Sequence, residues 1–325
     1  MFPFRYDTAA DEASALSAGA DGARYLAGGT TLVDLMRQTV ERPERVIDIN
    51  GLPYREIDLT PTRLRIGALV RMSELAAHPQ VRQQFPLISQ SLNLSASAQL
   101  RNMASIGGNL MQRPRCLYFR DVTAACNRRN PGSGCAAIGG RNRNLAILGT
   151  SSSCVATHPS DLAVALTALD ALIITRDGNG EHPIQIADFF RQPADTPDRE
   201  HNLAPGALIT SIEIPVRPDT RRSGYLKVRD RSSYEFALAS AAVAMDLTGG
   251  IIRSARIAVG GVGTVPWRLP AVERQLVGRP PSPQLWVSAA AAAADGAKPL
   301  SENGFKVELI KRTVQRQLAV VAGLP

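Results

Sequence analysis

All four cysteines of this 325-residue chain lie between positions 116 and 154. They fall inside a stretch, residues 101–161, that opens on a glycine-rich turn at 105–109 and closes on Ser160-Asp161. A chain that gathers every cysteine into one short stretch must fold that stretch around whatever the thiols bind or bond to. This stretch therefore constrains the fold more than any other part of the sequence.

The spacing of the cysteines leaves several kinds of site open. Two disulfides would suit an oxidising compartment, although a chain of this length does not need them for stability. A structural zinc usually has closely spaced cysteine pairs, and this sequence has none. Four thiolates on a glycine-rich loop that carries arginines favour an iron–sulfur cluster, because arginines and backbone N–H groups offset its negative charge. Zinc, disulfides and unbound thiols remain alternatives.

Two small-residue loops are candidate anion sites. The first, Gly28-Gly29-Thr30-Thr31, follows a short apolar strand and leads into a helical pattern that begins at Leu32. A strand, a glycine pair and a helix in this order present backbone N–H groups to an anion. The second loop, 105–109, contributes two glycines, which permit close approach of a ligand to the backbone. Each loop alone is equally consistent with a plain turn.

The order of the predicted elements indicates an α+β fold with more than one domain. Short strands alternate with helical patterns up to residue 216, residues 184–190 resemble a short strand, and residues 191–206 form a polar, proline-rich loop. A strand pair within 237–260 and later helical patterns, the last at 303–322, predict a sheet with helices. The polar segment 217–224 is the best boundary by composition.

The charge balance excludes little by itself. Lysine and arginine number 37 against 29 aspartates and glutamates, and the arginines are dispersed along the chain. A polyanionic cofactor or an acidic partner is therefore expected rather than a nucleic acid. No apolar run is long enough to span a membrane, and no signal peptide is visible at the N-terminus. The four histidines offer no obvious acid–base catalyst, so no catalytic residue is predicted.

Four motifs, in order along the chain, resemble those of the FAD-binding subunit of molybdenum hydroxylases. The motifs are Ala27-Gly28-Gly29-Thr30, Ser105-Ile106-Gly107-Gly108-Asn109, Ser160-Asp161 and Lys227-x-Arg229-x-Arg231. That family includes the flavin portion of xanthine dehydrogenase and the medium subunit of carbon monoxide dehydrogenase. The resemblance implies a two-subdomain FAD-binding domain of the vanillyl-alcohol-oxidase (PCMH-like) type. A sheet-plus-helices domain of the CO dehydrogenase flavoprotein type would follow it.

The resemblance divides the chain into three regions. Residues 1–55 would be the first FAD-binding subdomain, 56–219 the second, and 220–325 the C-terminal flavoprotein domain. Within the second, residues 110–157 form an insert that most family members lack, and this insert holds every cysteine. In this respect the chain is similar to the periplasmic aldehyde oxidoreductase type, whose flavin subunit carries an extra [4Fe–4S] cluster. The 4-hydroxybenzoyl-CoA reductase type fits less closely.

The resemblance also assigns residues to the two cofactors. The first loop would cradle the FAD pyrophosphate, the second would clamp the diphosphate and ribityl chain, Asp161 would accept hydrogen bonds from flavin hydroxyls, and Lys227 would lie beside the isoalloxazine ring. For Asp161 the alternative is an N-cap, and for Lys227 a solvated strand face. The loop residues are Leu26, Ala27, Gly28, Gly29, Thr30, Thr31, Leu32, Val33 and Asp34, then Ser105, Ile106, Gly107, Gly108 and Asn109. The cluster ligands would be Cys116, Cys126, Cys135 and Cys154.

The function implied by the resemblance is electron transfer within a larger enzyme. A molybdenum-cofactor subunit would oxidise an aldehyde, [2Fe–2S] centres on a third chain would carry the electrons, and FAD here would pass them to an external acceptor. The heterotrimer would be periplasmic, exported on a partner's signal, with the cytoplasm as the alternative. The rivals are the flavin subunit of another molybdenum hydroxylase, of the hydroxybenzoyl-CoA reductase or xanthine dehydrogenase type, a stand-alone flavin oxidase, and a zinc- or cluster-bearing binding module without enzymatic activity.

Overall fold

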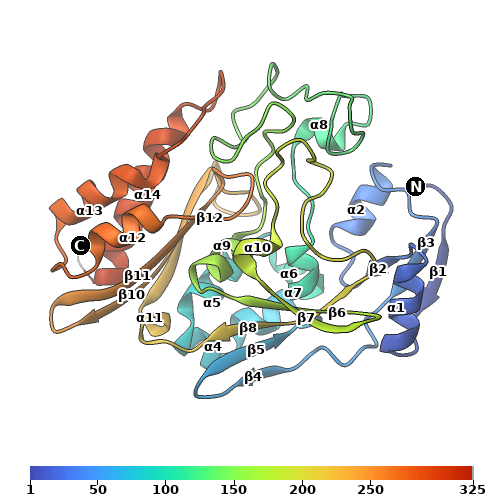
Figure 1. Cartoon of the computed structure of the whole chain (residues 1–325), viewed down its shortest axis with the longest axis horizontal. Coiled ribbons are helices and arrows are strands. Elements are labelled where there is room, and N and C mark those ends of the chain that lie inside the picture. The colour runs from blue at the N-terminus through green and yellow to red at the C-terminus, as the bar shows by residue number, and fades with distance from the viewer. Residues whose placement is uncertain (324–325) are drawn as a thin grey trace.

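Three sheets follow one another along the chain, each with its own helices (Figure 1). The computed structural model describes residues 1–323. The first sheet is parallel, with the strand order β1-β3-β2. Its first helix begins after Asp11, whose carboxylate accepts a hydrogen bond from the backbone N–H of Ser14. The elements of this region are β1 (Arg5–Thr8), α1 (Glu12–Ala20), β2 (Arg24–Leu26), α2 (Leu32–Arg37) and β3 (Arg45–Asp48).

The second sheet is antiparallel and has the strand order β4-β5-β8-β6-β7. Most of β8 is buried, because it pairs with β5 on one side and β6 on the other. The strands are β4 (Ile57–Leu59), β5 (Arg63–Gly67), β6 (Leu172–Asp177), β7 (Gly180–Gln185) and β8 (Leu208–Pro215). The helices of this region are α3 (Met72–Ala77), α4 (Pro79–Gln84), α5 (Pro86–Asn93), α6 (Ala98–Met103), α7 (Ile106–Leu110), α8 (Leu117–Arg120), α9 (Asp161–Ala168) and α10 (Ile186–Phe189).

The third sheet is antiparallel, with the order β12-β11-β10-β9, and helices pack against it. Its long hairpin turns at Gly249 and Gly250, whose φ angles of 62° and 74° favour glycine. The strands are β9 (Ser223–Val228), β10 (Ala239–Thr248), β11 (Ile251–Gly260) and β12 (Trp267–Arg268). The helices are α11 (Pro218–Arg221), α12 (Pro270–Leu276), α13 (Pro283–Ala290), the 3₁₀ helix η1 (Ala291–Ala294) and α14 (Phe305–Ala322).

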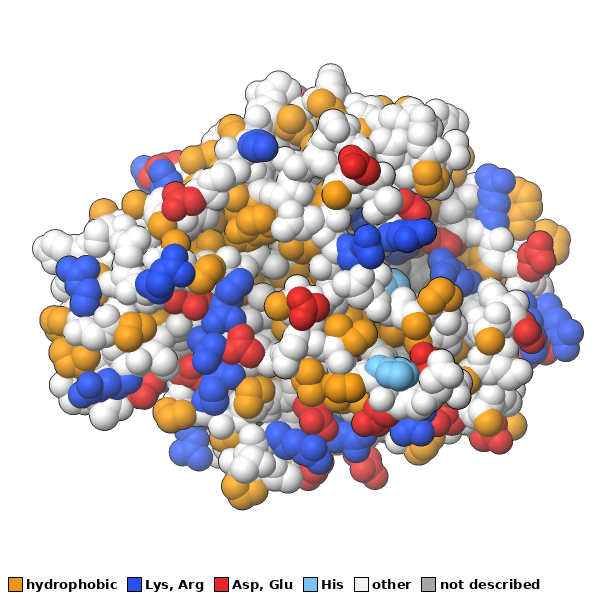
Figure 2. All heavy atoms as spheres, viewed as in Figure 1, with side chains coloured by type: hydrophobic (Ala, Val, Ile, Leu, Met, Phe, Trp, Pro, Cys, Tyr) orange, Lys and Arg blue, Asp and Glu red, His pale blue; other side chains and the backbone are white. Residues whose placement is uncertain are grey.

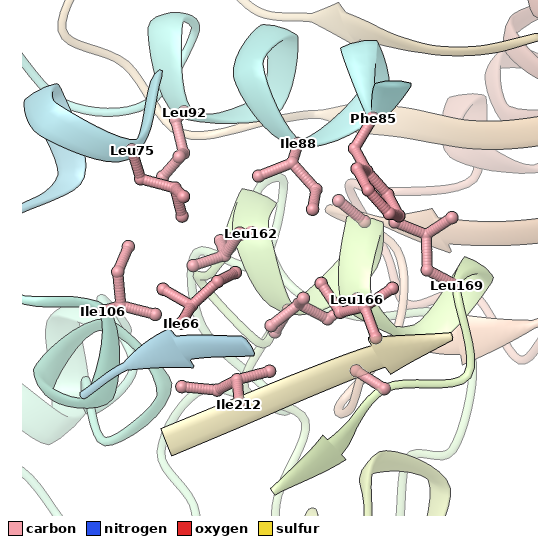
Figure 3. Packing of buried hydrophobic residues seen from close by; sticks show 14 of the residues in the cluster. Ile66, Leu75, Phe85, Ile88, Leu92, Ile106, Leu162, Leu166, Leu169 and Ile212 are labelled. Carbon is pink, nitrogen blue, oxygen red and sulfur yellow. The ribbon is translucent and has the colours of Figure 1, made fainter. Parts of the chain in front are cut away.

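Helix α9 is the centre of the largest core. All of its residues are buried, and it packs against α5 on one side and against β10 and β11 of the third sheet. Leu162 and Leu166 of α9 lie between Ile88 of α5 and the strand residues Ile66 and Ile212 (Figure 3). Full burial of one such side chain stabilises the fold by about 1.5–3 kcal/mol. Packing of α9 therefore fixes the positions of Ser160, which precedes the helix, and of Asp161, its first residue.

The α+β class and the sheet-plus-helices C-terminal part are confirmed, and two local predictions were wrong. Residues 105–109 are not a turn but the N-cap and first residues of α7, because the Ser105 hydroxyl accepts a hydrogen bond from the N–H of Gly108 (3.2 Å). Residues 184–190 do not form one strand, since β7 ends at Gln185 and α10 follows at once. The short strand β1 was missed, because four residues carry too little periodicity.

The cysteine-bearing segment 110–157 is mostly irregular and spans the molecule (Figure 1, green, top). On one side Arg115 forms an ion pair with Asp34 of α2 (3.0 Å). On the other, the backbone N–H of Asn142 donates to Glu302, just before α14 (2.8 Å). The segment therefore contacts both the first region and the C-terminal region, although it is inserted into the second.

Charged side chains of both signs are intermixed on the surface. Figure 2 shows lysines and arginines beside aspartates and glutamates over the visible face. This agrees with the dispersed arginines of the sequence. Nowhere in residues 1–323 is a helix both long enough and apolar enough to cross a membrane.

Lys306 anchors the first turn of α14 from inside the protein. It is fully buried, and its ammonium donates to the backbone oxygens of Leu145 (3.1 Å) and Gly261 (2.7 Å). These oxygens belong to the end of the cysteine-bearing segment and to the residue after β11. Burial, with a smaller effect of Arg143, lowers the pKa of Lys306 to about 7.

We expect Lys306 to make stability depend on pH. An unfolded chain keeps the lysine pKa near about 10.4, so between about pH 7 and 10 it binds more protons than the folded chain. Stability should rise with pH in this window, by up to roughly 1.4 kcal/mol per pH unit. The gain disappears as the pH falls below about 7, the folded-state pKa, because both states then bind the proton. Lys306→Met should remove this slope in urea unfolding series at several pH values.

The matched control for this prediction is Lys311→Met, on a partly exposed side chain of the same helix. It should keep the slope of the wild-type protein. If Lys306→Met also keeps the full slope, Lys306 is not the residue that titrates.

Candidate functional site

The loop between β2 and α2 leaves a row of backbone N–H groups free. Within residues 1–323, the N–H groups of Gly28, Gly29, Thr30 and Thr31 donate to no other backbone group. Gly29 has a φ of 70°, which favours glycine at this turn. The loop is neither buried nor fully exposed, so a ligand can reach it. Free N–H groups that precede a helix attract an anion, and this loop therefore fits a diphosphate.

The first loop is packed directly against the chain that precedes the second. A Cβ added to Gly28 would overlap the carbonyl oxygen of Met103. Arg71 fixes the junction, because it donates both to that carbonyl and to the side-chain oxygen of Asn50 (2.9 Å). The Asn50 amide in turn donates to the carbonyl of Ala27 (2.8 Å). The structure thus brings the two predicted FAD loops together.

The second loop offers less free backbone than the first. The N–H groups of Ile106 and Gly107 donate to carbonyl oxygens just after β5 (2.9 and 2.8 Å), and that of Gly108 donates to Ser105. Gly107 is required for packing, since an added Cβ would lie 2.9 Å from the Ala68 methyl. Gly108 is the exposed residue of this loop. A role in holding FAD remains a prediction for these residues.

Three hydrogen-bond donors converge on the carboxylate of Asp161. The hydroxyl of Tyr225 donates to Oδ1 (2.7 Å), while the ammonium of Lys227 (2.7 Å) and the hydroxyl of Ser95 (3.0 Å) donate to Oδ2. The side chains of Lys227 and Asp161 are 1% and 7% exposed, so this is a buried ion pair. Burial, and then the charge of Asp161, raises the pKa of Tyr225 well above 10, which keeps the hydroxyl a donor.

This geometry corrects two alternatives from the sequence. Ser160, not Asp161, is the N-cap of α9, because its hydroxyl accepts from the N–H of Ala163 (2.9 Å). Lys227 does not lie on a solvated strand face, since its side chain is buried. The same Ser160 hydroxyl donates to the side-chain oxygen of Asn109 (2.6 Å). The second loop and the Asp161 motif are therefore in direct contact.

A cavity of about 720 Å³ lies between the cysteine-bearing segment, the start of α9 and the third sheet. Its lining includes Asp161, Cys116, Phe236 from the β9–β10 loop and Gly261 after β11. The first loop and Lys227 are not part of the lining. Asp161 and one cysteine thus share a cavity, whereas the N–H groups of the first loop lie outside it.

His158, for which no catalytic role was predicted from the sequence, lies at this cavity. Burial, with a smaller effect of Arg128, lowers the pKa of His158 to about 3. Its Nδ1 accepts a hydrogen bond from the N–H of Ser160 (3.3 Å). Its ring packs edge-to-face against the ring of Phe190, with 4.5 Å between the ring centroids. A histidine that stays neutral at physiological pH is a poor general acid, and its contacts indicate a structural role.

The four cysteines converge in one buried group. Cys116, Cys126 and Cys154 are buried and Cys135 is partly buried, together with Leu35 of α2. All four are free thiols, so the disulfide alternative is not realised. Burial raises the pKa of Cys116 to about 11, and burial and the nearby Cys154 raise that of Cys135. Across residues 1–323, no set of three or more His, Cys, Asp and Glu side chains is arranged to hold a metal ion.

The carboxylate of Asp34 contacts the cysteine-bearing segment, and its role in holding FAD remains a prediction. It pairs with Arg115, the residue before Cys116 (3.0 Å), and with Arg120, the last residue of α8 (2.8 Å). The following residue, Leu35, packs among the cysteines. Helix α2 therefore begins at the N-H row of the first loop and ends its first turn against the cysteine group.

Two protein-family models match the chain and together cover most of it. Residues 3–217 match the model of the FAD binding domain in molybdopterin dehydrogenase, and residues 224–320 match the CO dehydrogenase flavoprotein C-terminal domain. The chain therefore belongs to the family of FAD-binding subunits of molybdenum hydroxylases, as its motifs indicated. It is a FAD-binding oxidoreductase subunit.

Two relatives align with this chain over nearly their whole length. The aldehyde oxidoreductase FAD-binding subunit PaoB of Escherichia coli (strain K12) is 45% identical over 304 residues, which is 92% of this chain and 91% of the relative. The glyceraldehyde dehydrogenase medium chain of Sulfolobus acidocaldarius is 28% identical over 94% of this chain and 92% of the relative. Both are subunits of larger enzymes by name, which indicates that this chain also works with other subunits.

Solved structures share the fold. Quinoline 2-oxidoreductase from Pseudomonas putida 86 matches with a TM-score of 0.77 at 21% identity, over 99% of this chain and 98% of the other. Carbon monoxide dehydrogenase from Hydrogenophaga pseudoflava matches with a TM-score of 0.75 at 23% identity, over 99% of both chains. At this identity the matches establish the architecture of the chain and not its substrate.

Replacing Gly28 by alanine should lower the FAD content of the purified protein. The added methyl group must displace the Met103 backbone and open the junction between the two loops. Flavin absorbance per chain after gel filtration measures the loss. Gly51→Ala is the matched control, because its Cβ would lie 4.0 Å from the Ala9 carbonyl oxygen. Wild-type flavin content in Gly28→Ala would contradict the assignment of this loop to the FAD diphosphate.

Replacing Asp161 by asparagine should cost about 3–5 kcal/mol of unfolding free energy, because it leaves the Lys227 ammonium buried without a counter-charge. Tyr225→Phe removes one hydrogen bond from the same carboxylate and should cost about 1 kcal/mol. Urea unfolding of the two variants gives the comparison. Equal losses would show that the charge of Asp161 matters no more than its hydrogen bonds.

Proposed function

We propose that this chain is the FAD- and [4Fe–4S]-containing electron-transfer subunit of a molybdenum-dependent aldehyde oxidoreductase. The observation that carries the proposal is 45% identity, over 92% of this chain, to a subunit named for aldehyde oxidation. The second relative is named for glyceraldehyde, which is also an aldehyde. The oxidation itself would occur on another subunit.

FAD would be held by the N–H row and by the motifs connected to it. The N–H groups of 28–31 would bind the diphosphate, and Asn109 and Asp161 would lie along the connection toward the cavity. When bound, FAD supplies the exchange between one-electron and two-electron carriers. The ion pair with the buried Lys227 holds the Asp161 carboxylate in place, and the cavity walls contributed by the third sheet would shield the cofactor from water.

The four thiols in one buried group have the number and type of ligands that an iron–sulfur cluster needs, although their side chains are not arranged to hold a single metal ion. Four unpaired thiols meet in one buried, largely apolar group. Arg128 brings a positive charge to Cys154. Such a charge offsets the negative charge of a thiolate-bound cluster. We therefore assign Cys116, Cys126, Cys135 and Cys154 as the ligands of a [4Fe–4S] cluster, which supplies one-electron transfer when bound.

The partners and the compartment follow from the same proposal. A [2Fe–2S] subunit would deliver electrons from a molybdenum-cofactor subunit, and an external acceptor would remove them. The likeness to subunits and medium chains of larger enzymes supports a heterotrimer. We further propose a periplasmic location, reached with a partner that carries the export signal. Fractionation of cells that express all subunits checks the location.

Anaerobic addition of an aldehyde to the purified complex tests the function. We expect bleaching of the flavin absorbance in the complete complex and none in the isolated chain, because the oxidising site lies on another subunit. Flavin bleaching in the isolated chain would instead support a stand-alone oxidase. No bleaching in a complex that contains all its cofactors would exclude aldehydes as substrates.

The metal assignment gives a separate prediction. Cys135→Ser should lose most of its iron yet keep its FAD, because Cys135 lies in the cysteine group and outside the FAD loops. Metal analysis and flavin absorbance of the same sample measure both. Ser152→Ala, on an exposed side chain two residues before Cys154, should retain the iron. Zinc in place of iron in the wild-type protein would contradict the cluster assignment and support a structural zinc site.

A further inference from the structure

Arg128 is a buried cation that contacts the cysteine group. Its Nη2 lies 3.6 Å from the sulfur of Cys154, and its Nη1 lies 2.8 Å from a carboxylate oxygen of Glu200. Only 6% of its side chain is exposed. Because the guanidinium plane is rigid, two partners on different nitrogens fix its orientation as well as its position.

Glu200 is the inner link of a chain of alternating charges. Its second oxygen accepts from Nε of Arg113 (2.6 Å), Arg113 also pairs with Glu41, and Glu41 pairs with Arg24 (3.0 Å). Arg24 is 54% exposed, Arg113 22% and Glu200 18%, so the chain runs from the surface into the protein. It ends at Arg128 and the sulfur of Cys154.

The loop that carries Glu200 is tied down on both sides. The backbone N–H of Arg191 donates to the carbonyl of Glu200 (3.0 Å), and Phe190 pairs with His201 in an isolated bridge. Farther along the loop, the carbonyl of Ala194 accepts from the hydroxyl of Ser151, three residues before Cys154. The backbone of Glu200 is therefore fixed while its carboxylate binds Arg128. Through these contacts the polar loop 191–206 packs beside the cysteine group.

Arg129, the next residue, shows that the contact of Arg128 with sulfur is particular to it. Arg129 donates to the backbone oxygens of Tyr118 and Phe119 (2.8 and 2.6 Å) and so fastens α8. Among the described residues it makes no hydrogen bond or ion pair with Glu200 or with a cysteine sulfur. Arg129 thus binds backbone carbonyls, whereas Arg128 contacts the thiol of Cys154.

We propose that Arg128, oriented by Glu200, is a positioning residue that raises the reduction potential of the metal cluster bound by the four cysteines. The proposal rests on the [4Fe–4S] assignment made above. A cluster that takes up one electron gains one negative charge, and no other bond changes. An N–H···S hydrogen bond and a buried positive charge stabilise that reduced form more than the oxidised one. Burial keeps solvent ions from screening the effect.

A redox titration of the purified complex, followed by the electron paramagnetic resonance of the reduced cluster, measures this. We expect Arg128→Gln to keep its iron and to lower the ratio of reduced to oxidised cluster at least tenfold at a fixed potential, equivalent to about 59 mV for one electron. Arg24→Gln is the matched control. It removes one positive charge from the exposed end of the same chain and should leave the ratio within about twofold.

Each outcome decides for or against the role of Arg128. An unchanged potential in an iron-containing Arg128→Gln protein overturns it. If Arg128→Gln loses its iron, Arg128→Lys decides, because it keeps the charge but lacks the fork that reaches Glu200 and Cys154 together. A lowered potential in Arg128→Lys supports the proposal. An unchanged potential in Arg128→Lys overturns the role of the N–H···S contact oriented by Glu200, and loss of iron from both variants overturns the proposal. Absence of iron from the wild-type complex would instead refute the cluster assignment itself.

Discussion

The buried ion pair between Asp161 and Lys227 joins the FAD-binding part of the chain to its C-terminal part. Asp161 begins α9, the helix at the centre of the largest core, and Lys227 lies in β9 at the edge of the third sheet. A buried pair adds little net stability, but it strongly penalises any arrangement that leaves one charge alone. The third sheet must therefore meet α9 in one orientation, and this contact builds a wall of the cavity.

Helix α2 plays the corresponding role between the two candidate cofactor sites. Its N-terminal end carries the free N–H groups of the first loop, while Asp34 and Leu35 hold the cysteine-bearing segment. Cys116 lies in the cysteine group and also lines the cavity that Asp161 reaches. Because one short helix supports both sites, a disturbance of the first loop is expected to reach the cysteines through a single turn of backbone.

Local patterns carried most of what the sequence could predict. The glycine loops, the Ser160-Asp161 motif and the cysteine cluster are recognisable because each is continuous along the chain. Their spatial connections are not, since Tyr225 and Asp161 are 64 residues apart and Lys227 and Asp161 are 66 apart. In the sequence, Lys227 alternates with Arg229 and Arg231, a pattern typical of a solvent-exposed strand face. Glu200 lies in a polar loop of the kind usually found at a protein surface. Only the packing of α9 and of that loop buries them.

One quantity decides whether the two sites exist together in this protein. It is the amount of FAD and of iron per chain in the wild-type protein purified with its partner subunits, from absorption spectra and metal analysis after correction for the partners' cofactors. We expect one FAD and four irons for each copy of this chain, as a flavin site and a [4Fe–4S] cluster require. Flavin without additional iron, or zinc in its place, would contradict the assignment of the cysteine group.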